Sequence, residues 1–205
     1  DLALRDCAAK IDWEHAEGQL VEYAARSPWP KGLVAHYPLD QLAFGELANT
    51  VAGGTAGILS GEADSVTGRI AGALALNSGQ SYVELSGIPE FNRFDTFSLG
   101  AWVTMVDAES GSLIARVGQN RKTDTGLQYH NPGLELTFAD GNLRVYLTHS
   151  RRDSTIEIVT GTKVPPAGWH HVFVTYDGSS RARGVTVYFD GESQPTEIVE
   201  DHLRD

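Results

Sequence analysis

The sequence lacks most of the features that mark disulfide-rich, membrane or nucleic-acid-binding proteins. Cys7 is its single cysteine, so no disulfide can form within the chain. No apolar run approaches the roughly 20 residues of a membrane-spanning helix, and no basic start followed by an apolar segment indicates a signal peptide. The 16 Lys and Arg are outnumbered by 27 Asp and Glu. The net charge of -11 argues against nucleic acid and anionic membrane surfaces as partners, and we expect no membrane insertion.

The first 32 residues differ from the rest of the chain. Between residues 2 and 25, Gly18 is the only Gly or Pro, and apolar residues recur at helical spacing. The segment Ser27-Pro28-Trp29-Pro30 then ends the helix, because proline lacks an N–H and disfavours helix before it. We expect residues 1–32 to form a helical extension and a Pro-rich linker. The chain begins with Asp1 rather than Met, so we expect it to be a piece of a larger protein.

From residue 33 to residue 205 the pattern changes to short strands and turns, which predicts one β-sandwich domain. The predicted strands cover residues 33–39, 73–76, 82–85, 97–104, 112–117, 133–139, 143–149, 156–159, 169–176 and 187–189. Residues 42–61 are expected to be rich in loops. The last two strands both end in Asp-Gly, which suits tight turns with positive φ. About ten short strands at this spacing predict a mainly β fold of antiparallel sheets.

The order of these patterns resembles that of laminin-G-like domains in the concanavalin A-like lectin/glucanase superfamily. The resemblance is carried by Trp169-His170-His171-Val172 together with residues 33–40, 68–74, 97–103, 176–178 and 188–191. It implies a jelly-roll sandwich of two curved antiparallel sheets. Members of the family continue with a strand that returns beside the first one, whereas this chain stops at Asp205. We therefore expect the last strand or strands to be missing.

A helix followed by such a domain also resembles a particular kind of parent protein. It is similar to the inserted module of large bacterial multidomain proteins that carry cytochrome-c-like regions. This chain has no Cys-x-x-Cys-His and so binds no c-type haem itself. The resemblance implies that the parent protein is periplasmic or extracellular.

The sequence argues against catalysis. Glucanases of the same fold carry Glu-x-Asp-x-x-Glu, and the nearest match, from Glu62 through Asp64 to Thr67, lacks the second Glu. Glycoside cleavage needs two carboxylates, and this segment is expected in a glycine-rich loop. His170 and His171 are adjacent in a strand and face opposite ways, so they cannot chelate one ion together. We expect one of them near the core and the other partly exposed.

The sequence assigns no metal or cofactor, although the resemblance leaves calcium open, because laminin-G-like domains often bind it at the rim of the sandwich. Oxygen ligands would suit that ion. The candidates in predicted loops are Asp40, Asn77, Asp107, Glu109, Asp124 and Asp177. None of them forms a spaced motif, and Asp177 and Asp190 are better explained as turn residues before glycine.

Sugar recognition would use aromatic faces and planar polar groups on a sheet or on loop tips. The candidate ligand-binding residues are Trp102, Arg116, Tyr129, His130, Arg144 and Tyr146. They lie on or beside predicted strands and would line the concave sheet. The alternative is that Trp102 and Tyr146 belong to the core of a second layer. The polar segment 119–131 is expected to be a long loop of the kind that carries binding function.

The sequence as a whole predicts a non-catalytic binding module of a larger exported protein. Its expected partner is a glycan or a neighbouring protein domain. The first alternative is a structural insert that spaces or docks the domains of its parent without a ligand. The second alternative is a glycoside hydrolase.

Overall fold

The computed structural model describes residues 30–76, 79–89, 91–105, 110–117, 121–122, 128–129, 133–150, 154–165 and 168–204. The chain divides into two compact units, residues 1–89 and residues 90–205, which are treated separately below. The helix predicted within residues 1–32 lies outside the described residues. Nowhere in the described ranges is there a helix with the length and apolar character needed to cross a membrane.

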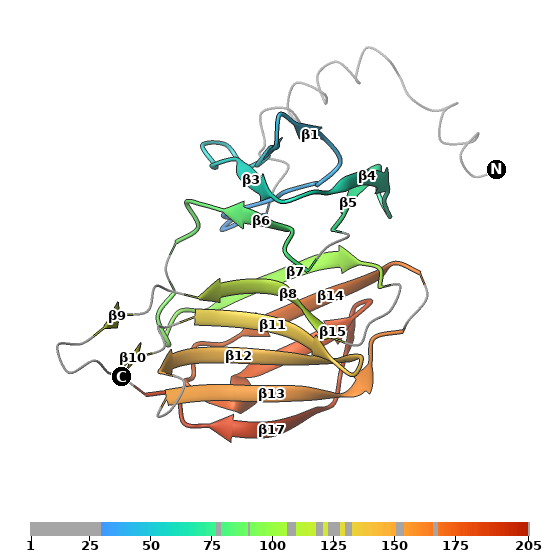
Figure 1. Ribbon diagram of the computed structural model, residues 1–205. Coiled ribbons are helices and arrows are strands. Elements are labelled where there is room, and N and C mark those ends of the chain that lie inside the picture. The colour runs from blue at the N-terminus through green and yellow to red at the C-terminus, as the bar shows by residue number, and fades with distance from the viewer. Residues whose placement is uncertain are drawn as a thin grey trace, which may run out of the picture. The chain divides into compact units, whose positions relative to one another are not determined.

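The first unit contains six short strands in its described part. They are β1 (Leu42–Ala43), β2 (Glu46–Leu47), β3 (Gly57–Ser60), β4 (Asp64–Thr67), β5 (Gly72–Ala75) and β6 (Tyr82–Leu85). Strands β1, β2, β3 and β6 form one antiparallel sheet in that order, and β4 pairs with β5 in a separate hairpin (Figure 1). Leu47 is 1% exposed and is the only hydrophobic residue of this unit's described part that is fully buried.

Two predictions for the first unit are wrong. Residues 33–39, expected to be the first strand, form no regular strand. The carbonyl of His36 instead accepts a hydrogen bond from the backbone N–H of Thr50 at 2.9 Å, and Asn49 Oδ1 accepts one from the N–H of His36 at 3.2 Å. This segment is therefore tied to a loop rather than to a sheet. Residues 64–67, expected in a loop, form strand β4, which pairs with β5.

The second unit contains eleven strands in its described part. They are β7 (Phe97–Val103), β8 (Ser110–Val117), β9 (Arg121–Lys122), β10 (Gln128–Tyr129), β11 (Gly133–Ala139), β12 (Asn142–Ser150), β13 (Ser154–Lys163), β14 (His170–Tyr176), β15 (Val185–Phe189), β16 (Glu192–Ser193) and β17 (Thr196–Asp201). A 3₁₀ turn, η1 (Ala182–Gly184), precedes β15. One antiparallel sheet has the order β17-β13-β12-β11-β8, and the other has the order β16-β15-β14-β7. Figure 1 shows them as two layers.

A single hydrophobic core joins these two sheets. Buried side chains alternate along the strands with half-buried or exposed ones, so that each strand turns one face inward. The buried residues of the five-stranded sheet are Leu136, Phe138, Leu143, Val145, Leu147, Ile156 and Ile158, and those of the four-stranded sheet are Val172, Val174, Tyr176, Val185, Val187 and Phe189. This packing of sheet on sheet confirms the predicted sandwich.

Tight turns connect the strands where the sequence predicted them. Asp140-Gly141 joins β11 to β12 with φ values of 54° and 81°, and Asp190-Gly191 joins β15 to β16 with φ values of 52° and 87°. Two successive residues with positive φ give the type I′ geometry that matches the twist of a hairpin.

Three strand regions of the second unit were not predicted. Strand β17 pairs with β13 and forms one edge of the five-stranded sheet. Strand β16 extends the hairpin after Asp190-Gly191. The segment 119–131 is not a simple loop, because β9 and β10 within it pair with each other.

Candidate functional site

The structure places four of the six predicted ligand-binding residues on the two sheets of the sandwich. Arg144 and Tyr146 lie together on β12, on the outward face of the five-stranded sheet. Trp102 lies on β7, in the four-stranded sheet. Arg116 lies on the edge strand β8 and shares a register position with Leu134, on the side turned toward the core. Tyr129 is described only as part of strand β10, and His130 lies outside the described residues.

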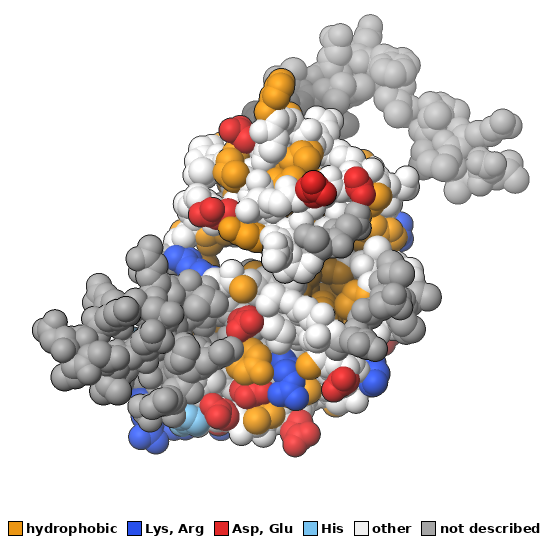
Figure 2. Space-filling view, in the orientation of Figure 1, with side chains coloured by type: hydrophobic (Ala, Val, Ile, Leu, Met, Phe, Trp, Pro, Cys, Tyr) orange, Lys and Arg blue, Asp and Glu red, His pale blue; other side chains and the backbone are white. Residues whose placement is uncertain are grey.

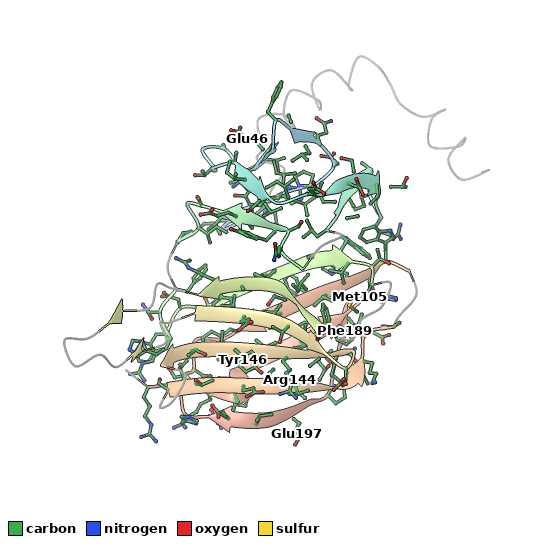
Figure 3. The ribbon with its side chains drawn as sticks, in the orientation of Figure 1. Glu46, Met105, Arg144, Tyr146, Phe189 and Glu197 are labelled. Carbon is green, nitrogen blue, oxygen red and sulfur yellow. The ribbon has the colours of Figure 1, made fainter. Side chains whose placement is uncertain are left out.

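Arg144 and Tyr146 form a polar cluster with Glu157 of the neighbouring strand β13. Glu157 Oε1 accepts a hydrogen bond from Arg144 Nη1 at 2.6 Å, and Glu157 is the register partner of Tyr146. Figure 3 shows Arg144 and Tyr146 on the same sheet layer. Both residues alternate with buried Leu143, Val145 and Leu147, so the alternative that Tyr146 is a core residue is wrong.

The ionisation of this cluster reflects its mutual contacts. Burial is the main cause that raises the pKa of the Tyr146 hydroxyl, and the hydrogen bond to Glu157 raises it further, while the hydrogen bond to Arg144 lowers it. The pKa of Arg144 is raised by its hydrogen bonds, first to Tyr146 and then to Glu157. The three groups therefore form one hydrogen-bonded cluster on this face of the sheet.

The rest of the outward face of the five-stranded sheet carries both charged and apolar side chains. On the other side of Tyr146, Glu135 is its register partner on β11 and accepts a hydrogen bond from Ser112 Oγ at 3.2 Å. Figure 2 shows acidic, basic and hydrophobic side chains interspersed over this part of the second unit. Such a surface is typical of a solvated sheet rather than of a continuous binding patch.

The outward face of the four-stranded sheet has a different character, because it carries a continuous row of four rings. The ring centroids of Trp102 and His171 are 5.1 Å apart, those of His171 and Phe173 are 5.7 Å apart, and those of Phe173 and Tyr188 are 6.3 Å apart. Trp102 is 41% exposed, which excludes the alternative that it is a core residue. We call these four residues, Trp102, His171, Phe173 and Tyr188, the aromatic row.

Strand register explains why the aromatic row forms. Residues paired across antiparallel strands place their side chains on the same face. His171 pairs with Trp102 of β7, and Phe173 pairs with Tyr188 of β15. Phe173 also pairs with Gly100 of β7, and a side chain there would collide with its ring. The ring of Phe173 therefore lies over the glycine, a known way of covering a gap in a sheet.

The two adjacent histidines have separate environments, as the strand alternation predicted. His171 faces outward and stacks with 26° between its plane and that of Phe173. His170 lies on the other side of the strand, with Nδ1 2.7 Å from Oδ2 of Asp190. Asp190 Oδ1 also accepts a hydrogen bond from the N–H of His171 at 2.8 Å. Asp190 is therefore a turn residue whose carboxylate also binds the first two residues of β14. The sequence did not indicate this second role.

The carboxylates that were weighed as calcium ligands do not form a metal-binding group in the described part of the chain. No group of three His, Cys, Asp or Glu side chains within the described ranges is placed to hold a metal ion. Of the calcium candidates, Asn77, Asp107, Glu109 and Asp124 lie outside those ranges. Asp177 Oδ1 accepts a hydrogen bond from the N–H of Ser179 at 2.9 Å, as a turn residue does. Glu62 and Asp64 of the incomplete glucanase motif are both exposed.

Sequence reasoning found Trp102 but missed its three ring partners. Each of them is visible in the sequence as the outward residue of an alternating strand. The sequence did not reveal the register in which β7, β14 and β15 pair. Alternation within one strand shows which residues face outward but not which residues of the next strand lie beside them.

Comparisons with known proteins agree with this architecture. A crystallised fragment of an S-layer domain-containing protein from Clostridium thermocellum is similar in structure, with a TM-score of 0.50 and 20% sequence identity over 82% of this chain and 72% of that one. No curated protein matches the sequence significantly. The laminin G family model described as "Concanavalin A-like lectin/glucanases superfamily" matches residues 77–204. The matched residues include both sheets of the sandwich, and the chain belongs to the concanavalin A-like lectin/glucanase superfamily.

Proposed function

We propose that the sandwich is a non-catalytic carbohydrate-recognition module that holds a glycan against the aromatic row. The observation that carries this proposal is the unbroken series of rings from Trp102 to Tyr188 on the outward face of one sheet. An exposed tryptophan at its end is 41% accessible and leaves ring surface for a ligand. Aromatic rings offer a large, rigid, apolar surface at small entropic cost, which suits the C–H face of a sugar.

Polar groups on the same face support a sugar rather than a purely apolar ligand. Ser98 of β7 and Thr186 of β15 are the register partners of Thr175 on β14, so three hydroxyl groups share the face with the rings. Hydroxyls can donate and accept hydrogen bonds. A ligand with apolar C–H faces and many hydroxyl groups therefore matches this surface better than a lipid or a charged peptide does.

The proposal includes the cellular location of the parent protein. We infer that the parent protein is exported, since extracellular and periplasmic surroundings are where a bacterial domain meets structural polysaccharides. The S-layer domain-containing protein from Clostridium thermocellum has the same fold. That likeness supports a binding or structural module and names no ligand.

A glycan array and affinity electrophoresis in soluble polysaccharides test the proposal. We expect Trp102→Ala to abolish retardation in the polysaccharide that the wild-type chain binds. Phe44→Ala is the matched control, because Phe44 is a fully exposed aromatic residue of the first unit, outside the aromatic row. Its retardation should equal that of the wild type.

Two outcomes would contradict the proposal. A spacer without a ligand would show no retardation in any polysaccharide and no binding on the array. A site elsewhere on the domain would leave the Trp102→Ala variant retarded like the wild type. Thermal unfolding of each variant shows whether a loss of binding is a loss of fold.

A further inference from the structure

A second feature of the sandwich is a small cavity where three chain segments meet beyond the end of β14. The cavity has a volume of about 230 Å³. Its lining residues are Arg93, Phe94, Ser179, Ser180, Arg181, His202, Leu203 and Arg204. Sites for drug-sized ligands usually measure roughly 300–1,000 Å3. This cavity therefore suits one small group, such as a single sugar, rather than an oligosaccharide.

The buried hydroxyl of Tyr176 fixes two walls of the cavity. It donates a hydrogen bond to the carbonyl of Arg93 at 2.6 Å and accepts one from the N–H of Ser180 at 2.8 Å. Tyr176 is 3% exposed and belongs to the core. The segments before β7 and after β14 are thereby held at one anchor point, which reduces the entropy lost when a ligand binds.

A second anchor fixes the third wall. Ser154 is buried, and its hydroxyl bonds both the N–H and the carbonyl of Arg204. The N–H of His202 donates to the carbonyl of Thr155 at 3.0 Å, and Leu203 between them is buried in the core. The backbone that carries His202 and Arg204 is therefore held along β13.

The charge of the cavity is opposite to that of the chain. Arg93, Arg181, Arg204 and His202 all line it, although the whole chain has a net charge of -11. Two carboxylates that precede His202 in the chain already have partners within the protein. Asp201 Oδ1 accepts a hydrogen bond from the N–H of Ala182 at 2.8 Å, and Glu200 lies 3.7 Å from the ring of His202. Three arginines among the lining residues favour an oxyanion, because the planar N–H groups of a guanidinium match carboxylate, sulfate and phosphate oxygens.

An exposed aromatic ring at the cavity indicates which kind of anion would bind there. Phe94 is 63% exposed at the cavity, and the guanidinium carbon of Arg93 lies 4.4 Å from its ring centroid. A bare inorganic anion would gain nothing from a phenyl ring. A ligand that has an apolar C–H face beside its acidic group would contact both the ring and the arginines.

We propose that this cavity binds one acidic sugar residue, with its carboxylate or sulfate held by Arg181 and Arg204 and its ring against Phe94. The site is separate from the aromatic row and does not depend on it. Ser179 and Ser180 also line the cavity, and a serine hydroxyl can donate and accept hydrogen bonds with sugar hydroxyls.

Isothermal titration calorimetry of the purified chain tests the proposal with glucuronate, glucose and inorganic sulfate as probes. We expect glucuronate to bind, glucose to bind at least about tenfold more weakly, and added NaCl to weaken glucuronate binding. Arg181→Gln and Arg204→Gln should each weaken glucuronate binding by about tenfold. Lys163→Gln is the matched control, because it removes one positive charge from an exposed position outside the cavity and should leave binding unchanged.

Further variants distinguish an acidic sugar from inorganic sulfate as the ligand. They also distinguish the cavity from the aromatic row as the site that binds it. Phe94→Ala should weaken glucuronate binding and leave sulfate binding unchanged, whereas Trp102→Ala should leave glucuronate binding unchanged. Equal binding of sulfate and glucuronate, with no effect of Phe94→Ala, would overturn the assignment to a sugar. No binding of glucuronate at millimolar concentration, or full binding by folded Arg181→Gln and Arg204→Gln variants, would overturn the site. Loss of glucuronate binding in Trp102→Ala would mean that the aromatic row, not the cavity, holds the acid.

Discussion

Nδ1 of His170 lies 2.7 Å from the carboxylate of Asp190, so the turn that closes the β15–β16 hairpin also holds the first residue of β14. Asp190 has a φ of 52°, a conformation that Asp and Asn adopt more readily than most residues. The same side chain accepts the N–H of His171, whose ring belongs to the aromatic row. The turn therefore positions the end of the proposed sugar-binding face through one carboxylate.

Replacing this carboxylate should change the dependence of stability on pH. The pKa of Asp190 lies below its ordinary 3.8, first because of the hydrogen bond to His170 and then because of the N–H of His171. A lowered pKa contributes stability above about pH 4, and that stability is lost as the pH falls through the folded-state value. Asp190→Asn keeps the turn and removes the charge. We expect it to unfold at lower urea than the wild type at pH 7, with the difference shrinking below pH 4.

A second Asp-to-Asn variant, measured over the same pH range, is the control. Asp140→Asn makes the equivalent change in the Asp-Gly turn between β11 and β12, where Asp140 has a φ of 54°. Its difference from the wild type should be smaller at pH 7. An Asp190→Asn difference that stays constant from pH 7 to pH 3 would show that the carboxylate contributes through geometry rather than through charge.

Tyr146 should ionise later than an exposed tyrosine. Its pKa is raised above 10, mainly by burial and also by Glu157. A raised pKa means that the stabilising contribution is complete below about pH 10 and is lost as the pH rises through the folded-state value. We expect Tyr146→Phe to remove the late part of the tyrosinate absorbance titration. Removal of amplitude from the early part of the curve, near pH 10, would contradict the burial of this hydroxyl.

Ser154 should contribute to stability well beyond its size. Its buried hydroxyl bonds both backbone groups of Arg204, and Ser154→Ala would leave them without that partner. Losing one partner of a buried hydrogen bond costs about 1–3 kcal/mol. We expect a decrease of that size in the free energy of unfolding, measured by urea denaturation. Ser98→Ala, at an exposed position on β7, is the control and should change it by less than about 0.5 kcal/mol.

The sandwich was largely predictable because its central strands alternate strictly. Strand β11 has the predicted bounds of residues 133–139, and buried Leu136 and Phe138 fall on one face. Strand β17 was missed, since four of its six residues are Thr, Glu or Asp and most are exposed. An edge strand that pairs through its backbone needs no apolar alternation, and charged residues are common there.

The first predicted strand failed for a different reason. Residues 33–39 have suitable local composition, yet their observed path follows Asn49, whose side chain accepts the N–H of His36 and donates to Tyr37. Strand propensity is a preference that contacts elsewhere in the chain can override. For the predicted ligand-binding residues, alternation identified outward positions such as Trp102 and Arg144 but could not assign them to different sheets.

Gly100 should be intolerant of even one added methyl group, although it lies in a strand where alanine is normally accepted. A Cβ there would stand 2.5 Å from Phe173 Cδ2 and 2.7 Å from the carbonyl oxygen of Val172. The ring can move, but the carbonyl belongs to the paired strand β14 and cannot, so Gly100→Ala should cost about 1–3 kcal/mol of unfolding free energy. Gly111→Ala on β8 is the matched control, because its Cβ would meet nothing within 4 Å. We expect that control to be neutral or slightly stabilising, since alanine restricts the unfolded chain. Near-ultraviolet circular dichroism should change only for Gly100→Ala, and an unchanged spectrum with unchanged stability would mean that Phe173 does not rest on the glycine.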